Sequence, residues 1–233
     1  IGGYYDGEYS NDIWSSSNGV NWVLENESAE VSGRHRHRLA IFQDKLWLIG
    51  GLGGDTKSDV WSSENGVNWT QMSVSPSFPR RYDHQIISFA DKLWIIGGDT
   101  PSSGGSGNDD DIWYSEDGEN WTRVTDNAVF GGRHGHQVVK FADKLWLIGG
   151  ISGCYPGCVT NDIWSSDDGI NWTEEKANAE FTGRELHQVV SFSGKLWMTG
   201  GKDGDYKSTN RVWSSEDAVN WRQGYQIPIS FNE

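Results

Sequence analysis

The sequence predicts an all-β protein built as a five-bladed β-propeller, in which each blade is a four-stranded antiparallel sheet. Three observations lead to this fold class. Tryptophans recur in five pairs of constant spacing, which begin at Trp14, Trp61, Trp113, Trp164 and Trp213. Each pair belongs to a repeat of about 50 residues that also carries a Gly-Gly pair. Short runs rich in Val, Ile and Trp alternate with turn residues, and no helical period is visible.

One repeat shows how the four strands arise. In the unit that begins "RHGHQVVKFADKLWLIGG" at Arg133, two apolar runs are joined by a turn at Ala142 and Asp143. A third run, "NDIWSS", leads through the turn "DDGINW" into a fourth run that begins "NWTEE". Such a sheet carries large apolar side chains on both faces, so face-to-face packing of successive sheets buries them. We therefore expect the 14 tryptophans to fill the space between blades.

The blades follow the repeats, and the first one is incomplete. We expect one domain over residues 1–233, with blades at 1–30 plus 225–233, 31–78, 79–130, 131–181 and 182–224. The chain starts at "IGG", the end of a second strand. The segment "YQIPISFNE" at 225–233 is similar to "HQIISFAD" at 84–91, which predicts that it supplies the innermost strand of the first blade and closes the ring. Counting from Trp221 instead ends the chain before a new inner strand, so a six-bladed parent stays open.

Charge and apolar content narrow the class of partner. The chain has 19 Lys and Arg against 33 Asp and Glu, a formal charge of -14. A polyphosphate would be repelled, so we expect no nucleic acid partner. No stretch approaches the roughly 18 apolar residues of a membrane-spanning helix, so we expect no membrane span.

The cysteines indicate a compartment. Cys154 and Cys158 are the only two, in "GCYPGC", where Pro156 and Gly157 can turn the chain back on itself. We expect a disulfide between them in an oxidising compartment, with two free thiols as the alternative. Two cysteines without a histidine in the loop do not make a zinc site. The expected location is extracellular, cell-surface or periplasmic.

The repeats resemble a known family. The units "RxxHQVVxFxDKLWxIGG" and "NDIWSSxDGxNWT" look like kelch repeats of the bacterial and galactose-oxidase-like kind, over nearly the whole chain. This resemblance implies a propeller in which the loops between second and third strands share one face with the links between blades. It does not imply one activity, because kelch propellers serve as enzymes, lectin-like binders and adaptors. The turn "SSDDGINW" at 165–172 is also similar to the Asp-box of sialidase-like propellers, which is a turn structure and implies no sialidase site.

Candidate ligand-binding residues lie where the repeats differ, in the loops 4–11, 52–58, 99–111, 151–161 and 202–210 and just after each R-x-x-H arginine. They are the arginines Arg34, Arg81, Arg133 and Arg184, the residues His35, Arg36, Tyr82, His134 and Glu185 that follow them, and the loop tyrosines Tyr4, Tyr5, Tyr9, Tyr155 and Tyr206. Tyrosine faces suit sugar rings, and arginine suits carboxylates or hydroxyls. Structural pairing of the arginines with acidic neighbours or backbone carbonyls is the alternative.

We expect a non-enzymatic, lectin-like binding propeller that takes a glycan or another protein as its partner and needs no cofactor. No nucleophile, base and orienting group can be grouped from the sequence. We read the R-x-x-H histidines as buried and hydrogen-bonded. Calcium at 108–111 or 202–207 is an alternative without EF-hand spacing. The functional alternatives are an interaction module in a larger extracellular assembly and a small sialic-acid-processing or lyase-type enzyme.

Overall fold

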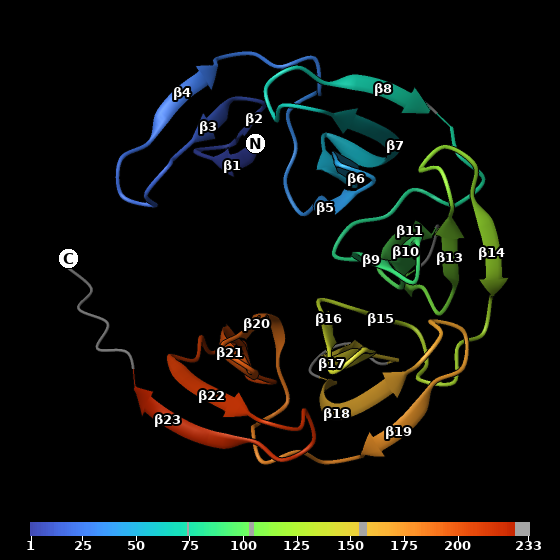
Figure 1. Ribbon diagram of the computed structural model, residues 1–233, viewed down its shortest axis with the longest axis vertical. Helices are drawn as coiled ribbons and strands as arrows, with labels where there is room; N and C mark the ends of the chain where they lie inside the picture. Colours follow the sequence, from blue (N-terminus) through green and yellow to red (C-terminus); the bar gives the residue numbers. More distant parts are fainter. Residues whose placement is uncertain (74, 103–104, 154–157, 227–233) are drawn as a thin grey trace.

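The computed structural model describes residues 1–73, 75–102, 105–153 and 158–226. Their 23 strands form a propeller around a central axis (Figure 1). Four complete blades follow an N-terminal unit of two hairpins, and the chain runs outward from the innermost strand in each blade. The all-β propeller is confirmed, with four blades arranged around the axis.

The strands are grouped by blade. The N-terminal unit pairs β1 (Gly3–Tyr5) with β2 (Glu8–Ser10) and β3 (Ile13–Ser15) with β4 (Val23–Asn26). Blade 1 contains β5 (Arg38–Phe42), β6 (Lys45–Gly53), β7 (Asp55–Ser63) and β8 (Thr70–Ser73). Blade 2 contains β9 (Gln85–Phe89), β10 (Lys92–Ile96), β13 (Ile112–Ser115) and β14 (Thr122–Thr125), with the hairpin of β11 (Asp99–Ser102) and β12 (Gly105–Asn108) between its second and third strands.

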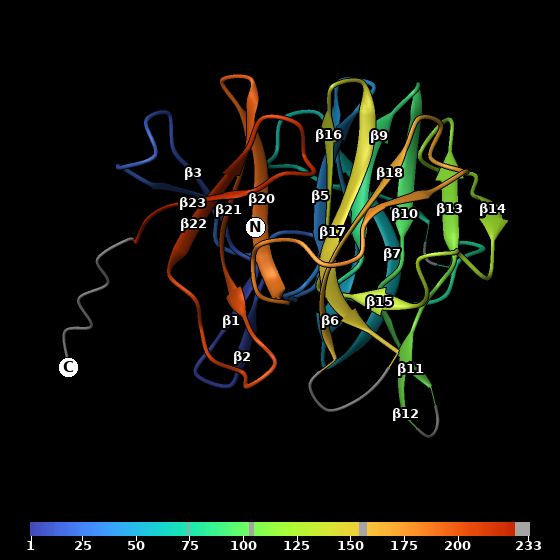
Figure 2. The ribbon, with the colours of Figure 1, turned by 90° about the horizontal axis from the view of Figure 1, so that it is seen from below.

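Blades 3 and 4 complete the arrangement. Blade 3 contains β15 (Arg133–His134), β16 (Gln137–Phe141), β17 (Lys144–Ser152), β18 (Val159–Ser166) and β19 (Thr173–Lys176). Blade 4 contains β20 (Glu185–Phe192), β21 (Lys195–Lys202), β22 (Arg211–Ser215) and β23 (Arg222–Gln226). Figure 2 shows that the hairpins β1–β2 and β11–β12 project from the same side of the ring, which we call the loop face.

Tryptophan packing between blades is confirmed. One core cluster joins Trp47 and Ile49 of blade 1 to Ile86, Trp113 and Trp121 of blade 2. Each link between complete blades adds a phenylalanine to the apolar core between the two blades that it joins. Phe78, for example, lies 5.1 Å from Trp121 between ring centroids and meets it edge-on at 82°. Such edge-to-face pairs are a favoured aromatic geometry. The linker therefore packs under the blade that it leads into.

Glycine allows this packing at the turn between third and fourth strands. A Cβ on Gly118 of blade 2 would lie 2.2 Å from the Trp47 ring of blade 1, and the residue has a φ of +80°. Both the close approach and the left-handed backbone favour a residue without a side chain. Gly169 and Trp94 repeat the contact between the next two blades. Trp47 and Trp94 are thus each covered by the turn of the following blade.

At the two ends of the array of blades, tryptophans that are buried in the middle repeats are exposed to solvent. Trp14 and Trp22 of the N-terminal unit are 47% and 59% exposed, and Trp197 of blade 4 is 38% exposed. Trp94, at the same repeat position as Trp197, is fully buried. The difference follows from position, because a complete blade lies beside Trp94 on both sides.

The expected start of the closing strand is corrected in part. Tyr225 and Gln226 belong to β23, where Gln226 pairs with Arg211 of β22. They extend the outermost strand of blade 4 and do not begin an inner strand, because the β22 ladder reaches that far. Residues 227–233 lie outside the described residues. No helix in the described part of the chain is long and apolar enough to cross a membrane.

Candidate functional site

The R-x-x-H arginines are buried within their blades. The exposed fractions of Arg34, Arg81, Arg133 and Arg184 are all 1% or less. Arg81 donates from Nη1 to Asp111 Oδ1 at 2.6 Å and from Nη2 to Asp111 Oδ2 at 2.8 Å. Its Nη1 also donates to the carbonyl oxygen of Gly97 at 2.9 Å. Asp59 and Asp162 hold Arg34 and Arg133 in the same two-pronged way.

These ion pairs agree with the alternative interpretation for Arg34, Arg81 and Arg133, which is structural pairing with acidic neighbours. A bidentate carboxylate and a backbone carbonyl satisfy the donors that a ligand would need. The same carboxylate accepts the indole N–H of a repeat tryptophan, as Trp113 Nε1 shows at 2.6 Å from Asp111 Oδ2. Burial alone would raise the pKa of Asp59, but hydrogen bonds and charge from Arg34 hold that pKa below its usual value. Arg184 is also buried and donates to backbone oxygens of Thr182 and Gly200.

Each arginine also links its blade to the preceding one. The amide of Gly51 in blade 1 donates to the carbonyl oxygen of Arg81 at 2.9 Å, and Gly98 does the same to Arg133. The histidine three residues later packs on the first glycine of the pair. A Cβ on Gly50 would lie 3.1 Å from His84 Cε1, at a φ of +62°. The Gly-Gly pair is therefore required both for its backbone conformation and for this contact.

Three of the four R-x-x-H histidines are buried, as expected, but two of these lack the expected hydrogen bonds. His84, His136 and His187 are fully buried. Neither ring nitrogen of His84 or His136 has a hydrogen-bond partner among the described residues. Burial lowers the pKa of His187 to about 3, and the nearby Arg184 charge adds to the effect. Burial likewise lowers the pKa of His37 to about 4. These imidazoles are neutral spacers at pH 7.

The second residue after each arginine forms a hydrogen-bonded chain around the axis. Asp83 N donates to Arg36 O at 3.2 Å, Gly135 N to Asp83 O at 3.0 Å, and Leu186 N to Gly135 O at 2.8 Å. All four residues have a positive φ, between +51° and +63°. Left-handed backbone at Leu186 is unusual for a large side chain. The chain of amides, which we call the rim, joins the four complete blades at the mouth of the loop face.

An aromatic group lies beside the rim. Tyr4 and Tyr9 face each other across the β1–β2 hairpin, with ring centroids 4.9 Å apart. His35 lies 5.3 Å from Tyr4 and 5.6 Å from Tyr9 between ring centroids. Tyr4 is 52% exposed, whereas Tyr9 and His35 are half-buried. We call these three rings the aromatic platform.

Charged groups continue from the platform along the rim. Arg36 Nη1 forms an ion pair with Asp83 Oδ2 at 3.0 Å, and its guanidinium carbon lies 5.5 Å from the centre of the Tyr82 ring. Tyr82 donates its hydroxyl to Asp99 Oδ2 at 2.7 Å, and burial together with this bond raises the Tyr82 pKa. Burial raises the pKa of Asp83, which the positive charge of Arg36 opposes. Asp83 is thus already paired with Arg36, and Asp99 already accepts a hydrogen bond from Tyr82.

The remaining candidates lie around this centre. Glu185 lies at the rim, where a Cβ on Gly135 would be 3.3 Å from its own Cβ. Burial raises the pKa of Glu185, and the nearby charge of His134 opposes this shift. Tyr5 is 85% exposed next to the platform, and Tyr206 is 48% exposed in the loop of blade 4. Tyr155 lies outside the described residues. Cys154 does too, so the predicted disulfide with Cys158 stays a prediction.

The acidic residues before β13 contact an arginine of their own blade. Asp111 holds Arg81, and Asp109 Oδ2 lies 3.7 Å from Arg81 Nη1. Burial raises the pKa of Asp109 to about 7, even though Arg81 lowers it. Among the residues that the structure describes, no three His, Cys, Asp or Glu side chains converge as metal ligands. These acidic residues therefore provide internal pairing.

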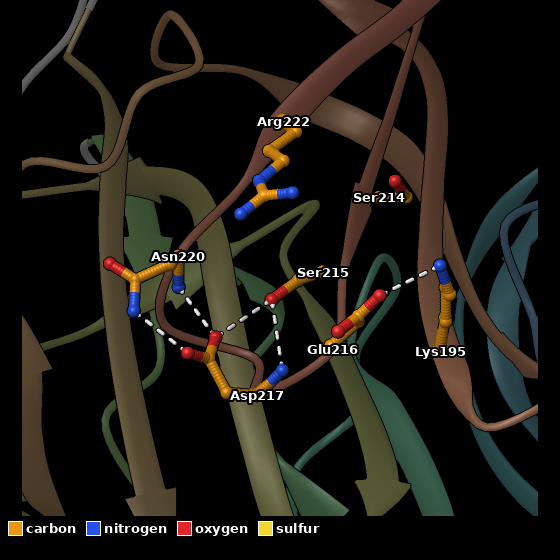
Figure 3. Close-up of a pocket in the computed structure, with 7 residues that line it drawn as sticks. All are labelled: Lys195, Ser214, Ser215, Glu216, Asp217, Asn220 and Arg222. Atoms are coloured by element: carbon orange, nitrogen blue, oxygen red, sulfur yellow. Dashed lines mark hydrogen bonds and ion pairs between the residues drawn. The ribbon is translucent and has the colours of Figure 1, made fainter.

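The Asp-box-like turns also have a structural role. Figure 3 shows a pocket of blade 4 whose wall is such a turn. Asp217 accepts hydrogen bonds from Ser215 Oγ at 3.1 Å and from the amide of Asn220 at 2.7 Å. Burial would raise the Asp217 pKa, but the Asn220 hydrogen bonds and the other turn donors lower it to about 2. In the turn at 165–172 the same bonds go to Asp168, one residue after the acidic position of the Asp-box pattern.

Sequence reasoning missed the carboxylates that hold the arginines. The signal was present, because an aspartate stands two residues before the first tryptophan in four of the five repeats: Asp12, Asp59, Asp111 and Asp162. It also missed the ion pair of Arg36 with Asp83.

The ion pair can be tested by comparing two aspartates at the same repeat position. Asp111→Ala removes the carboxylate that accepts two hydrogen bonds from Arg81 at less than 3 Å, and we expect it to lower the free energy of unfolding by about 3–5 kcal/mol. Asp12→Ala removes a carboxylate bonded only to Ser10 and Trp14 among the described residues, with an expected loss of about 1 kcal/mol. Urea unfolding measures both. Equal losses would contradict the role assigned to the pair.

The buried histidines predict a pH dependence. A folded pKa of about 3 for His187 lies below the unfolded value near 6.5, so only the unfolded state binds a proton between these values. The stability is complete above pH 6.5 and falls as the pH drops toward 3, by about 1.4 kcal/mol per pH unit for this histidine. We expect His187→Gln to reduce the slope of unfolding free energy against pH by that amount.

Urea unfolding at several pH values between 6.5 and 4.5 provides the measurement, and the difference between variant and wild type isolates the histidine from the carboxyl groups. His84→Gln is the matched variant in another blade, because its pKa is lowered by the same kind of burial. A slope unchanged in both variants would show that these imidazoles are protonated in the folded state.

Comparison with known proteins agrees with this architecture. No curated protein matches the chain. The model of a family described as the DUF6242 beta propeller domain matches residues 40–167, from β5 through β18. Because this match spans more than half of the chain, the protein belongs to the DUF6242 beta propeller domain family.

Proposed function

We propose that the loop face binds carbohydrate without catalysis, at the aromatic platform and the charged part of the rim. The observation that carries the proposal is the partly exposed group of Tyr4, Tyr9 and His35, which adjoins the Arg36–Asp83 pair. The repeated packing of the propeller does not use these three rings. A location outside the cytoplasm is part of the proposal.

The chemistry of the group suits a sugar. The three rings lie with centroids 4.9 to 5.6 Å apart and planes tilted by 38° to 65°, and the exposed Tyr4 ring among them offers an apolar surface on which a sugar ring can stack. Sugar hydroxyls need directional donors and acceptors at the edge of such a surface. The Arg36 side chain, which is 42% exposed, supplies donors, and tyrosine hydroxyls supply both functions. Asp83 is already paired with Arg36, which favours binding over proton transfer.

Glycan binding can be measured on an array and then by titration. We expect Tyr4→Ala to weaken binding by about tenfold, since loss of a stacked ring corresponds to about 1.4 kcal/mol. The melting temperature should change little, because Tyr4 is 52% exposed. Ile170→Ala is the matched control, with an exposed side chain at 49% in the turn between third and fourth strands, at the opposite end of the blade. An array without any signal for the wild type would overturn the proposal.

We further propose that the propeller is of the kelch type and closes with five blades, the N-terminal unit being completed by an innermost strand. The part of the ring between blade 4 and blade 1 supports this, because apolar side chains are exposed on both of the strands that border it. Leu39 and Ile41 on β5 are 44% and 69% exposed, and Val190 and Phe192 on β20 are 54% and 68% exposed. An apolar strand between them would cover both faces. The segment "IPISF" at 227–231 has that character.

Closure predicts a result at Trp197. In a closed ring Trp197 would pack on Gly19, as Trp94 packs on Gly169. We then expect Trp197→Ala and Trp94→Ala to lower the free energy of unfolding by similar amounts, about 3–5 kcal/mol each. Guanidinium unfolding provides the comparison. A loss at Trp197 of less than half that at Trp94 would contradict closure, because it would match the 38% exposure of an uncovered ring.

A further inference from the structure

Blade 4 departs from the other complete blades at the position that carries the buried carboxylate. Two residues before the first tryptophan, blades 1 to 3 have Asp59, Asp111 and Asp162, whereas blade 4 has Arg211. The arginine that these carboxylates hold is still present as Arg184. Blade 4 therefore has two guanidinium groups where the others have an ion pair.

The other blades define what the carboxylate does there. In blade 1, Asp59 Oδ1 accepts from Arg34 Nη1 at 2.6 Å, and Oδ2 accepts from Arg34 Nη2 at 2.8 Å and from Trp61 Nε1 at 2.7 Å. Three fixed donors thus converge on one planar group. The carboxylate side chain is 14% exposed, so the position touches solvent.

The same donors are held in place in blade 4. Arg184 is fully buried, and its Nη1 donates to the carbonyl oxygen of Gly200 at 3.1 Å, as Arg34 does to Gly50. Trp213 is 7% exposed, and its indole Nε1 is buried without a hydrogen-bond partner among the described residues. A buried N–H without an acceptor is unfavourable and rare. Phe181 packs against both Arg184 and Trp213, which fixes their relative position.

The charges around these donors favour an anion. Burial lowers the pKa of Arg184 to about 10, and the neighbouring charge of Arg211 acts in the same direction. Asp203 opposes this shift from the loop of blade 4, but its Oδ1 already accepts the amides of Asp205 and Lys207. The Arg211 side chain is exposed and contacts Gln223 Oε1 at 3.2 Å. An added carboxylate would relieve the repulsion between the two guanidinium groups.

We propose that blade 4 binds a carboxylate anion between Arg184, Arg211 and the indole N–H of Trp213, at the position that an aspartate side chain fills in the other complete blades. One carboxylate oxygen accepts from Arg184, and the other accepts from Arg184 and Trp213. Arg211 covers the anion from the solvent side. The site does not depend on carbohydrate binding at the aromatic platform, because the residues of the two sites differ.

The indole N–H of Trp213 reports directly on the site. In a ¹H–¹⁵N spectrum of the uniformly labelled protein, we expect one indole signal to shift in a saturable way on titration with sodium acetate at constant ionic strength, with chloride as the replaced anion. Trp213→Phe assigns that signal by removing it. The indole signals of Trp61, Trp113 and Trp164 are internal controls, because their acceptors are already aspartates. A titration in which the Trp213 signal does not move, or moves equally with chloride, overturns the proposal.

Arg211→Asp is the sharpest variant, since it restores the residue of the other blades. We expect its Trp213 signal to lie near the bound position without acetate, its response to acetate to be lost, and its melting temperature to rise. Arg211→Ala should keep the response with about twofold to fivefold weaker binding, since only one exposed charge is removed. An Arg211→Asp protein that still responds to acetate like the wild type would place the anion elsewhere and overturn the proposal.

The source of the carboxylate is separated by a second titration. Glucuronate and glucose are compared with acetate on the same indole signal. Tighter binding of glucuronate than of acetate, without a response to glucose, identifies a sugar-borne carboxylate as the better ligand. Equal binding of glucuronate and acetate identifies the free carboxylate as sufficient. Both results support the site, and a response to glucose equal to that of glucuronate contradicts it. Loss of glycan binding by Tyr4→Ala would leave all of these results unchanged.

Discussion

The structure depends on a buried arginine that acts in two directions at once. Its side chain holds the second and third strands of its own blade through a glycine carbonyl and an aspartate, while its backbone carbonyl accepts an amide from the preceding blade, as Arg81 does from Gly51. A charge at this depth is tolerated only when its donors are satisfied in good geometry. The same arginine thus takes part in the pairing of strands, in the contact between blades and in the orientation of the tryptophan. These three features therefore form together, which makes this residue a strong determinant of a single packing arrangement.

Most of the architecture could be predicted from the sequence because packing between identical units leaves a period. Trp47, Trp94 and Trp146 are buried at corresponding places, and the Gly-Gly pairs have the positive φ that their conformation requires. The arginine pairing could not be read in the same way. Arg81 and Asp111 are 30 residues apart, and a repeat shows that both recur without showing that they meet. The histidines look like hydrogen-bonding groups, yet the close approach of Gly50 and not a polar partner explains His84.

The candidate site was only partly predictable for a related reason. Loop variability points to Tyr4, Tyr9 and His35 one by one, but their contact depends on a hairpin register and on the neighbouring blade. Neither is visible in a linear pattern. The spacing of the repeats does not predict that Asp83 pairs with Arg36, which lies 47 residues earlier. Departures from the repeat say more about binding sites than the repeat itself. Arg211, for example, places a positive charge at a position where the other repeats have an aspartate in the same geometry.

The rim has a consequence for how such a protein can diversify. Its contacts from blade to blade are made by peptide groups, which leaves the identity of the side chains open, although the Arg36–Asp83 ion pair adds a side-chain contact between blades 1 and 2. Accordingly, they are a cation at Arg36, an anion at Asp83, a hydrogen at Gly135 and an alkyl group at Leu186. The scaffold thus separates assembly from recognition at the level of single residues. New specificities can be acquired at the mouth by stepwise substitution while the toroid itself is inherited unchanged.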